Sequence, residues 1–246
     1  MQKKLPVLKI VFFIIIFFLI TVPVAFLLKD DVNSYSRVLT HEFYSQDNID
    51  ILFCGASHVS HGIDARISDK AFNKNTFSSG TPSQGINGTY AIIQQALKSY
   101  KVSKIYLECD FAIVCRSESV PKQMGKSDFI VLNFLKDKKL KFKFIQENSS
   151  AENILNVFLP IGKDKMMTLS PKKFLNKCKS LLNGYYFKYE YAEKDAGYGG
   201  KGCVLNYDIV QDGTFSNDHS EAAFLPVSDY WKSYIMRICD LCEENN

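Results

Sequence analysis

The chain opens with an apolar stretch, residues 10–28, that contains no charged residue. At about 1.5 Å per residue, a helix of this length nearly matches a hydrocarbon core of about 30 Å, and Pro23 is compatible with a membrane helix. Because Lys3, Lys4 and Lys9 precede the stretch, the positive-inside rule predicts a cytoplasmic N-terminus and an extracellular remainder. A cleaved signal peptide is the alternative, but the stretch is long for one and no clear cleavage site follows it.

Beyond this stretch, the apolar positions predict short strands and amphipathic helices. Residues 49–54 and 104–110 have the pattern of buried strands, and residues 72–78 form a weaker candidate. One helix is expected from the apolar stripe of Ile86, Tyr90, Ile93, Leu97 and Tyr100. The order strand, helix, strand predicts a right-handed crossover and a parallel sheet, hence an α/β fold.

The second half of the chain is expected to be helical and then irregular. Residues 128–182 are helical in pattern and basic, with breaks near Pro160, Gly162 and Pro171. Residues 185–209 are aromatic and then Gly-rich, which predicts a long flexible loop. Ser228 is the expected cap of a last helix.

These patterns divide the chain into three parts. Residues 1–29 are a cytoplasmic tip and a transmembrane signal anchor, residues 30–48 are a polar linker, and residues 49–246 are one α/β domain. The domain is long enough to bury a core of its own.

Charge and cysteine content narrow the class of protein further. The net charge of +4 comes largely from two Lys-rich segments, 136–143 and 163–177, which we expect to be solvated helix faces. Nucleic acid is not an expected partner, since the domain is only mildly basic and carries no recognition motif. Seven cysteines cannot all pair within one chain. Cys54 and Cys109 are expected to be buried in strands, and the C-x-x-C pair Cys239 and Cys242 to pack rather than to bind zinc.

Ser57 follows the first predicted strand directly. Ligands of parallel sheets collect at the carboxyl ends of the strands, and Gly55 and Ala56 leave room there for a tight turn. A serine in this place can attack a carbonyl if a histidine takes its proton. The alternative is a turn or helix-cap serine.

A nucleophilic Ser57 needs a histidine as its base, and the chain offers three candidates. His58 is adjacent to Ser57, and adjacent side chains usually diverge, so we expect it to line the site rather than to act as the base. His61 is also close to Ser57 in the sequence, and such a close neighbour rarely serves as the base. With Asp64 and Asp69 nearby, the two histidines match no known metal-ligand spacing, so we expect neither metal nor cofactor. His219 is the distant candidate for the base, and a surface histidine is its alternative.

Three segments together resemble the SGNH (GDSL-like) hydrolase superfamily. They are "ILFCGASHVSHGID" (residues 51–64), "FSSGTPSQGINGTYAIIQQAL" (77–97) and "KIYLECDF" (104–111). Within this superfamily, the segments most resemble the membrane-anchored members that occur with cell-envelope and polysaccharide acylation systems. It implies a three-layer sandwich with a parallel sheet.

The resemblance also implies roles for individual residues. Ser57 would be the nucleophile, with Ala56 where the usual pattern has an acid. Gly80 and Asn87 would supply oxyanion donors. The final Asp-x-x-His block is not found, because Ser216 stands where the acid before His219 would be. The domain is therefore expected to lack its last strand and this block.

The expected function is an SGNH-type esterase or O-acyl-transfer component that acts on acyl esters of cell-surface glycans, inactive if its base is missing. It would be a single-pass cell-membrane protein with an extracellular domain. One alternative is a non-catalytic envelope protein that binds glycan or a membrane acyltransferase partner. Another is a membrane-anchored α/β domain without hydrolase ancestry.

Overall fold

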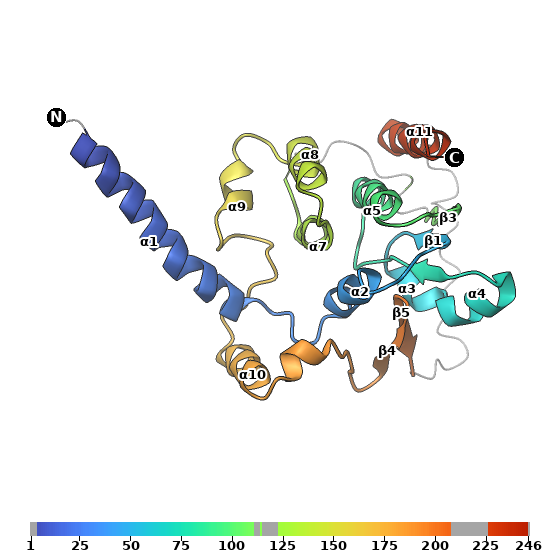
Figure 1. Cartoon of the computed structure of the whole chain (residues 1–246), viewed down its shortest axis with the longest axis horizontal. Coiled ribbons are helices and arrows are strands. Elements are labelled where there is room, and N and C mark those ends of the chain that lie inside the picture. Colours follow the sequence, from blue (N-terminus) through green and yellow to red (C-terminus); the bar gives the residue numbers. More distant parts are fainter. Residues whose placement is uncertain (1–3, 111–113, 115–122, 208–225, 246) are drawn as a thin grey trace.

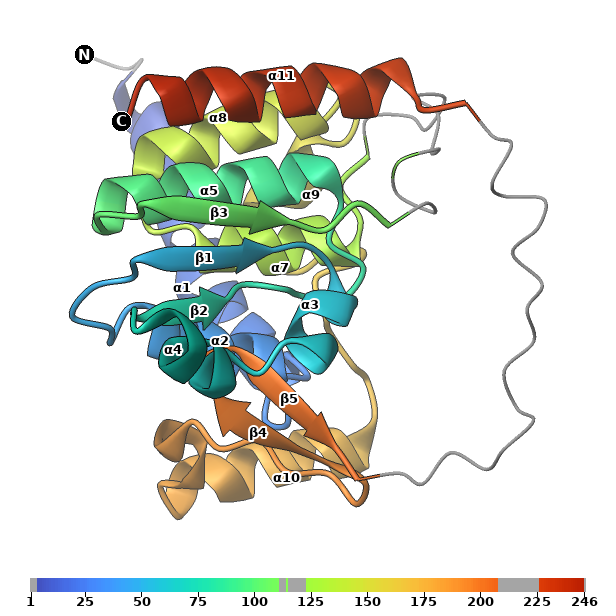
Figure 2. The ribbon, with the colours of Figure 1, turned by 90° about the vertical axis from the view of Figure 1, so that its right-hand side faces the viewer.

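The computed structural model describes residues 4–110, 114, 123–207 and 226–245. Its centre is a parallel sheet of three strands in the order β2-β1-β3. The strands are β1 (Ile51–Cys54), β2 (Thr76–Ser78) and β3 (Lys104–Leu107), and all three point the same way (Figure 2). The expected α/β class with a parallel sheet is confirmed.

Helices make the connections between the strands. The chain passes from β1 to β2 through α3 (Ser57–Gly62) and α4 (Ala65–Phe72), and from β2 to β3 through α5 (Ile86–Ser99). The helix expected between the second and third strands is thus confirmed, with Ile86 and Ile93 of its apolar stripe buried. The weak strand candidate at 72–78 shortens to β2, because Phe72 still belongs to α4.

Helices pack on both faces of the sheet. On one face, Leu52 and Cys54 belong to the main core, which also contains Phe77. On the other face, Ile51 and Phe53 pack against Val59 of α3. Alternating residues of β1 therefore point into two separate apolar clusters, as expected for a strand buried on both sides.

The larger core is covered by helices from the second half of the chain (Figure 1). They are α7 (Lys126–Phe134), α8 (Lys138–Asn148) and α11 (Asp229–Glu243). Ser228 caps α11 as expected, since its hydroxyl oxygen accepts a hydrogen bond of 3.1 Å from the backbone N–H of Trp231. After α8 come the short helix α9 (Ile154–Phe158) and the longer helix α10 (Pro171–Leu182). A 3-10 helix, η1 (Tyr185–Lys188), follows α10.

Residues 30–48 are not an irregular linker. They contain α2 (Tyr35–Phe43), whose Leu39 and Phe43 are fully buried in the main core. The apolar positions Tyr35, Val38, Leu39 and Phe43 have helical spacing, which the polar residues between them conceal. The α/β domain therefore begins packing before the first strand.

The Gly-rich segment is a hairpin rather than a flexible loop. β4 (Ala196–Gly200) and β5 (Cys203–Asn206) pair antiparallel, and Lys201 and Gly202 form the turn with positive φ angles of 51° and 79°. The N–H of Ser78 donates to the carbonyl of Lys201 at 3.0 Å. This bond fixes the hairpin to the end of β2.

β3 is an edge strand, and its residues are half-exposed or exposed rather than buried as expected. It ends at Leu107, so Cys109 lies beyond it and is exposed, whereas Cys54 is buried as expected. A strand at the edge of a three-stranded sheet has a neighbour on one side only, so its pattern in the sequence overstates its burial.

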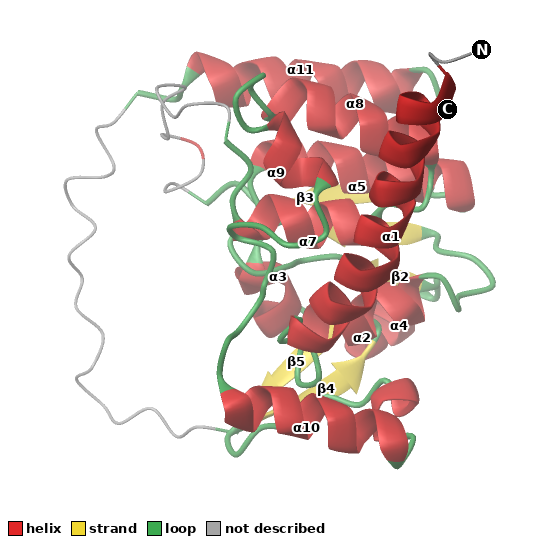
Figure 3. Ribbon diagram, turned by 90° about the vertical axis from the view of Figure 1, so that its left-hand side faces the viewer, coloured by secondary structure: helices red, strands yellow, loops and turns green. Residues whose placement is uncertain are grey.

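α1 (Lys4–Leu28) projects from the domain (Figure 1). Its segment Val7–Leu28 has a mean hydropathy of 3.1 and is long and apolar enough to span a membrane. The end of α1 lies beside α10 (Figure 3). It is joined to the segment before α10 by hydrogen bonds from the N–H of Thr168 to the carbonyl of Leu28 (3.0 Å) and from the N–H of Asp30 to that of Met166 (2.8 Å).

One lysine of the segment 163–177 contradicts the expectation of a solvated helix face. Lys177 of α10 is 1% exposed and forms an ion pair with Asp31, which is also buried. The phenol of Tyr186 donates a second hydrogen bond to Asp31 at 3.1 Å. This pair ties α10 to the residues that follow α1.

Candidate functional site

The carboxyl ends of the strands and the turns that follow them make up the candidate site. After β1 the chain passes through Gly55 and Ala56 and enters α3 at Ser57. A β-carbon on Gly55 would lie 2.2 Å from Oε2 of Glu108. Only glycine leaves room for the Glu108 side chain here, so the turn that presents Ser57 is shaped by the residue that follows β3.

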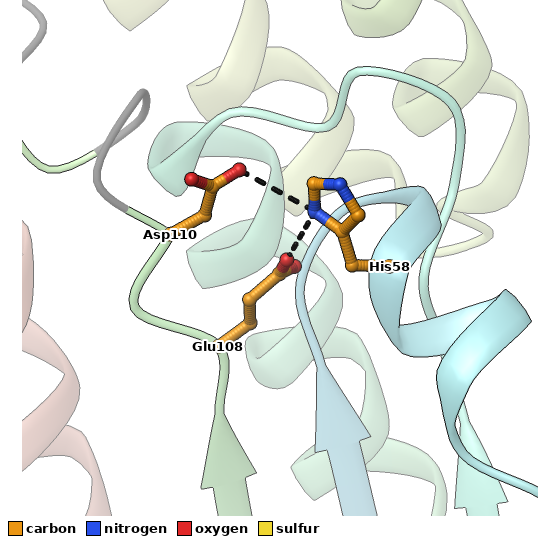
Figure 4. A group of neighbouring side chains, drawn as sticks. All are labelled: His58, Glu108 and Asp110. Carbon is orange, nitrogen blue, oxygen red and sulfur yellow. Dashed lines mark hydrogen bonds and ion pairs between the residues drawn. The ribbon is translucent and has the colours of Figure 1, made fainter. Parts of the chain in front are cut away.

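Glu108 holds this turn with both carboxylate oxygens. Its Oε2 accepts a hydrogen bond of 2.5 Å from the backbone N–H of Ala56, and its Oε1 lies 2.8 Å from Nδ1 of His58. Oδ2 of Asp110 lies 3.3 Å from the same nitrogen (Figure 4). Since ionised carboxylates only accept hydrogen bonds, Nδ1 of His58 is the donor in both contacts.

Ser57 is half-buried at the start of α3. Its carbonyl accepts hydrogen bonds from Nδ1 of His61 at 2.8 Å and from the hydroxyl of Ser60 at 3.0 Å. Within the described part of the chain, the Ser57 hydroxyl has no hydrogen-bond partner. Both nearby histidines are thus bonded to other groups, as we expected for His58.

Gly80 lies against the start of the same helix. A β-carbon on Gly80 would lie 2.2 Å from the carbonyl oxygen of Ala56 and 2.9 Å from the backbone nitrogen of Ser60. The structure therefore brings together Gly80 and the turn before Ser57, which the sequence separates by more than 20 residues. No described residue accepts a hydrogen bond from the Gly80 N–H.

Asn87 has a different environment. Its side-chain amide nitrogen donates to Oδ1 of Asp128 at 3.0 Å and to Oδ1 of Asn148 at 2.7 Å. Both hydrogens of the amide are thereby used in joining α5 to α7 and α8. Asn87 has no amide hydrogen left for an oxyanion. His219 lies outside the described residues.

The site contains two acids that the sequence argument did not single out. Glu108 and Asp110 follow β3 as closely as Ser57 follows β1, and that position was the available signal. Finding them required knowing that β3 lies next to β1. Asp64 and Asp69, the acids considered from sequence, have other partners: Asp64 caps α4 and Asp69 pairs with Lys201.

His58, Glu108 and Asp110 offer one imidazole nitrogen and two carboxylate oxygens within 4.8 Å of one another. This donor set is of a kind that divalent cations accept. The hydrogen bonds that the three side chains make to one another account equally well for their arrangement. The expectation of no metal remains a prediction.

Two further groups near the site have altered pKa values. Burial raises the pKa of the Cys54 thiol to about 12, so this cysteine of β1 is protonated and unreactive at neutral pH. The Arg66 side chain holds the pKa of the Asp64 carboxyl below its usual range through hydrogen bonds of 2.6 and 2.9 Å. Neither group competes with Ser57 as a nucleophile.

Comparison of the chain with protein-family models, with curated proteins and with solved structures found no match. The resemblance in the three strand-and-turn segments is therefore unsupported by these comparisons, and the function has to be argued from the geometry of the site.

Proposed function

We propose that the protein is a membrane-anchored SGNH-type esterase or O-acyl-transfer component that uses Ser57 to act on acyl esters of cell-surface glycans. The observation that carries this proposal is the place of Ser57. It is the first helical residue after the central strand, its hydroxyl has no partner among the described residues, and Gly80 lies against its turn. A nucleophile in a parallel sheet is expected at such a strand end.

The reaction would proceed by acyl transfer through the serine. Oγ of Ser57 attacks the ester carbonyl, its proton passes to a base, and the glycan leaves as an alcohol that takes up the proton. Water or a second hydroxyl then takes the acyl group from Ser57. The backbone N–H groups of Ser57 and Gly80 are the proposed donors to the oxyanion.

The base is the part of this proposal that rests on sequence alone. His58 is turned toward Glu108 and His61 toward the Ser57 carbonyl, so neither imidazole is hydrogen-bonded to the Ser57 hydroxyl. His219 remains the proposed base. Asn87 is left out because its amide hydrogens are used elsewhere.

The Glu108 carboxylate would then act as a positioning group. By accepting the Ala56 N–H and holding His58, it fixes the turn that carries Ser57. The extracellular placement of the domain follows from the lysines before α1 and belongs to the same proposal.

Labelling with a fluorophosphonate probe tests the nucleophile. The full-length protein in mild detergent should be labelled, and the Ser57→Ala variant should not. The Ser45→Ala variant is the control, since Ser45 is an exposed serine at the end of α2. Equal labelling of wild type and Ser57→Ala would overturn the assignment, and unchanged labelling of His219→Ala would remove His219 as the base.

A non-catalytic role is the second candidate. It is favoured by one observation: within the described residues, no histidine is hydrogen-bonded to the Ser57 hydroxyl. The protein would then bind glycan or a membrane acyltransferase partner with the same strand ends. Ester hydrolysis or acyl transfer by the purified wild type, lost in Ser57→Ala, would exclude this role.

A further inference from the structure

A pocket of about 470 Å³ lies where α1 joins the domain. Its walls come from the residue after α1, from α2, α7 and η1, and from the segment before α10. Residues that represent these walls are Lys29, Arg37, Tyr44, Lys136, Met166 and Tyr186. We call it the membrane-proximal pocket. Its volume is in the range of small-molecule sites, which is about 300–1,000 Å³.

The charges that line this pocket are mostly positive. Lys29, Arg37 and Lys136 face one acid, Asp31. Asp31 already accepts hydrogen bonds from Lys177 and from the phenol of Tyr186. Lys29 also lies 3.8 Å from this carboxylate. Because three cations and one acid line the pocket, the region carries an excess positive charge that would favour an anion.

Two of these cations have no carboxylate partner in the described part of the chain. Arg37 donates to the backbone carbonyls of Asp31 (2.9 Å), Val32 (3.2 Å) and Tyr186 (2.7 Å). Lys136 is exposed, and its Nζ lies 3.8 Å from the centre of the Tyr44 ring. These contacts hold the two side chains in place but leave their charges without a counter-ion.

The position of the pocket identifies where an anion would come from. Lys29 directly follows Leu28, the last residue of the helix that is long and apolar enough to span a membrane. Phe26 of that helix packs against Tyr186, with ring centres 5.7 Å apart. Tyrosines and lysines at the end of such a helix lie at the level of lipid head groups.

We propose that the membrane-proximal pocket binds the phosphate-bearing head group of an anionic membrane lipid. Lys29 and Lys136 would contact the phosphate, and the tyrosine rings would contact the rest of the head group. This proposal depends on the placement of α1 in a bilayer and is independent of the chemistry of Ser57.

A second pocket adjoins the membrane-proximal pocket. It measures about 480 Å³ and shares Lys29, Ser34 and Met166 with the first. It reaches Pro82, two residues beyond Gly80 of the candidate site. The two pockets together therefore lead from Lys29 toward the loop that follows β2.

Native mass spectrometry of the full-length protein released from detergent tests the proposal. We expect dioctanoyl phosphatidylglycerol to bind at least 5-fold more tightly than dioctanoyl phosphatidylcholine. The Lys136→Gln variant should bind the anionic lipid about 5-fold more weakly, because one lysine near a lipid surface contributes about 1 kcal/mol. The Lys29→Gln/Lys136→Gln variant should lose the preference.

Controls separate this site from general electrostatics and from the candidate active site. Lys139→Gln removes an exposed lysine of α8 outside the pocket and should bind as the wild type does. Ser57→Ala should also retain binding, whatever its effect on labelling. The proposal is overturned if the wild type does not prefer phosphatidylglycerol, or if the double variant retains the preference. If inorganic phosphate displaces the lipid at equal concentration, the site takes free phosphate and the lipid proposal is wrong.

Discussion

The ends of the sheet and the membrane-proximal pocket differ in what holds them together. At the sheet ends, two glycines leave no room for a β-carbon: Gly55 lies against the side chain of Glu108, and Gly80 against the backbone carbonyl of Ala56. At the membrane end, buried side-chain charges do so, through Asp31 and Lys177. The first arrangement depends on the absence of a β-carbon, and the second on the presence of a counter-ion.

The charged side chains of the two regions also differ in their exposure to solvent. The His58 side chain is 71% exposed, while its partners Glu108 and Asp110 are 13% and 16% exposed, so solvent screens the group from the imidazole side. The Lys177 and Asp31 side chains are 1% and 6% exposed. Removing one partner of a buried pair leaves an uncompensated charge, whereas removing one partner of an exposed pair does not.

The largest expected effect is therefore that of breaking the buried pair. Lys177→Ala should lower the free energy of unfolding by about 3–5 kcal/mol, since it leaves buried Asp31 with only the more distant Lys29, 3.8 Å away, as a counter-ion. Urea unfolding in mild detergent, followed by circular dichroism, measures this. Lys179→Ala, an exposed lysine on the same helix, should change stability by less than about 0.5 kcal/mol.

A double variant shows whether charge or packing is responsible. Asp31→Asn/Lys177→Met removes both charges and keeps similar volumes, so it should recover much of the loss. A loss below about 1 kcal/mol for Lys177→Ala would mean that water reaches Asp31, and the contrast between the two regions would disappear.

The second-largest effect on stability is expected from adding a single methyl group at the sheet ends. Gly80→Ala should lower the free energy of unfolding by about 1–3 kcal/mol, because its β-carbon would meet the Ala56 carbonyl. It should also reduce probe labelling of Ser57 by moving the turn. Gly62→Ala at the end of α3 is the matched control, since its β-carbon would meet nothing within 4 Å. Similar stabilities of the two variants would contradict the close contact.

The smallest effect is that of the partly exposed charge of Asp64, and it depends on pH. Arg66 lowers the pKa of Asp64 in the folded protein. The charged carboxylate therefore stabilises the fold when the pH is above the pKa of Asp64 in the unfolded chain, which is about 3.9. Asp64→Asn should keep the helix cap but lower stability at pH 7 by about 0.2–1 kcal/mol. The difference from wild type should shrink as pH falls below about 4 through the folded pKa. A difference that persists at pH 2 would mean that the charge is not its source.

The same contrast explains how much of the molecule could be predicted from the sequence. β1, α5 and α11 were predicted because apolar periodicity and the Ser228 cap are local signals. At the sheet ends, Ser57 was singled out because it follows a predicted strand, and Gly80 because of the resemblance, and the structure places Gly80 against the turn before Ser57. Glu108 was not found, because its role depends on the order of strands in space.

The remaining differences have their own physical reasons. α2 was not predicted because polar residues separate its apolar positions. The β4–β5 hairpin was not predicted because Gly199 and Gly200 carry no side chain with a pattern to read. Lys177 looks like its neighbours Lys172 and Lys173 in the sequence, and its burial is decided by Asp31, 146 positions away.

The short connection between α1 and the domain limits how far the protein can reach. Residues 29–34 separate α1 from α2. Fully extended, they would span about 20 Å, and their bonds to residues 166–168 remove most of that freedom. If α1 spans a bilayer, this short connection would keep the strand ends close to the lipid. The proposed reaction at Ser57 would then be limited to esters near the membrane and would not reach esters far out in a cell wall.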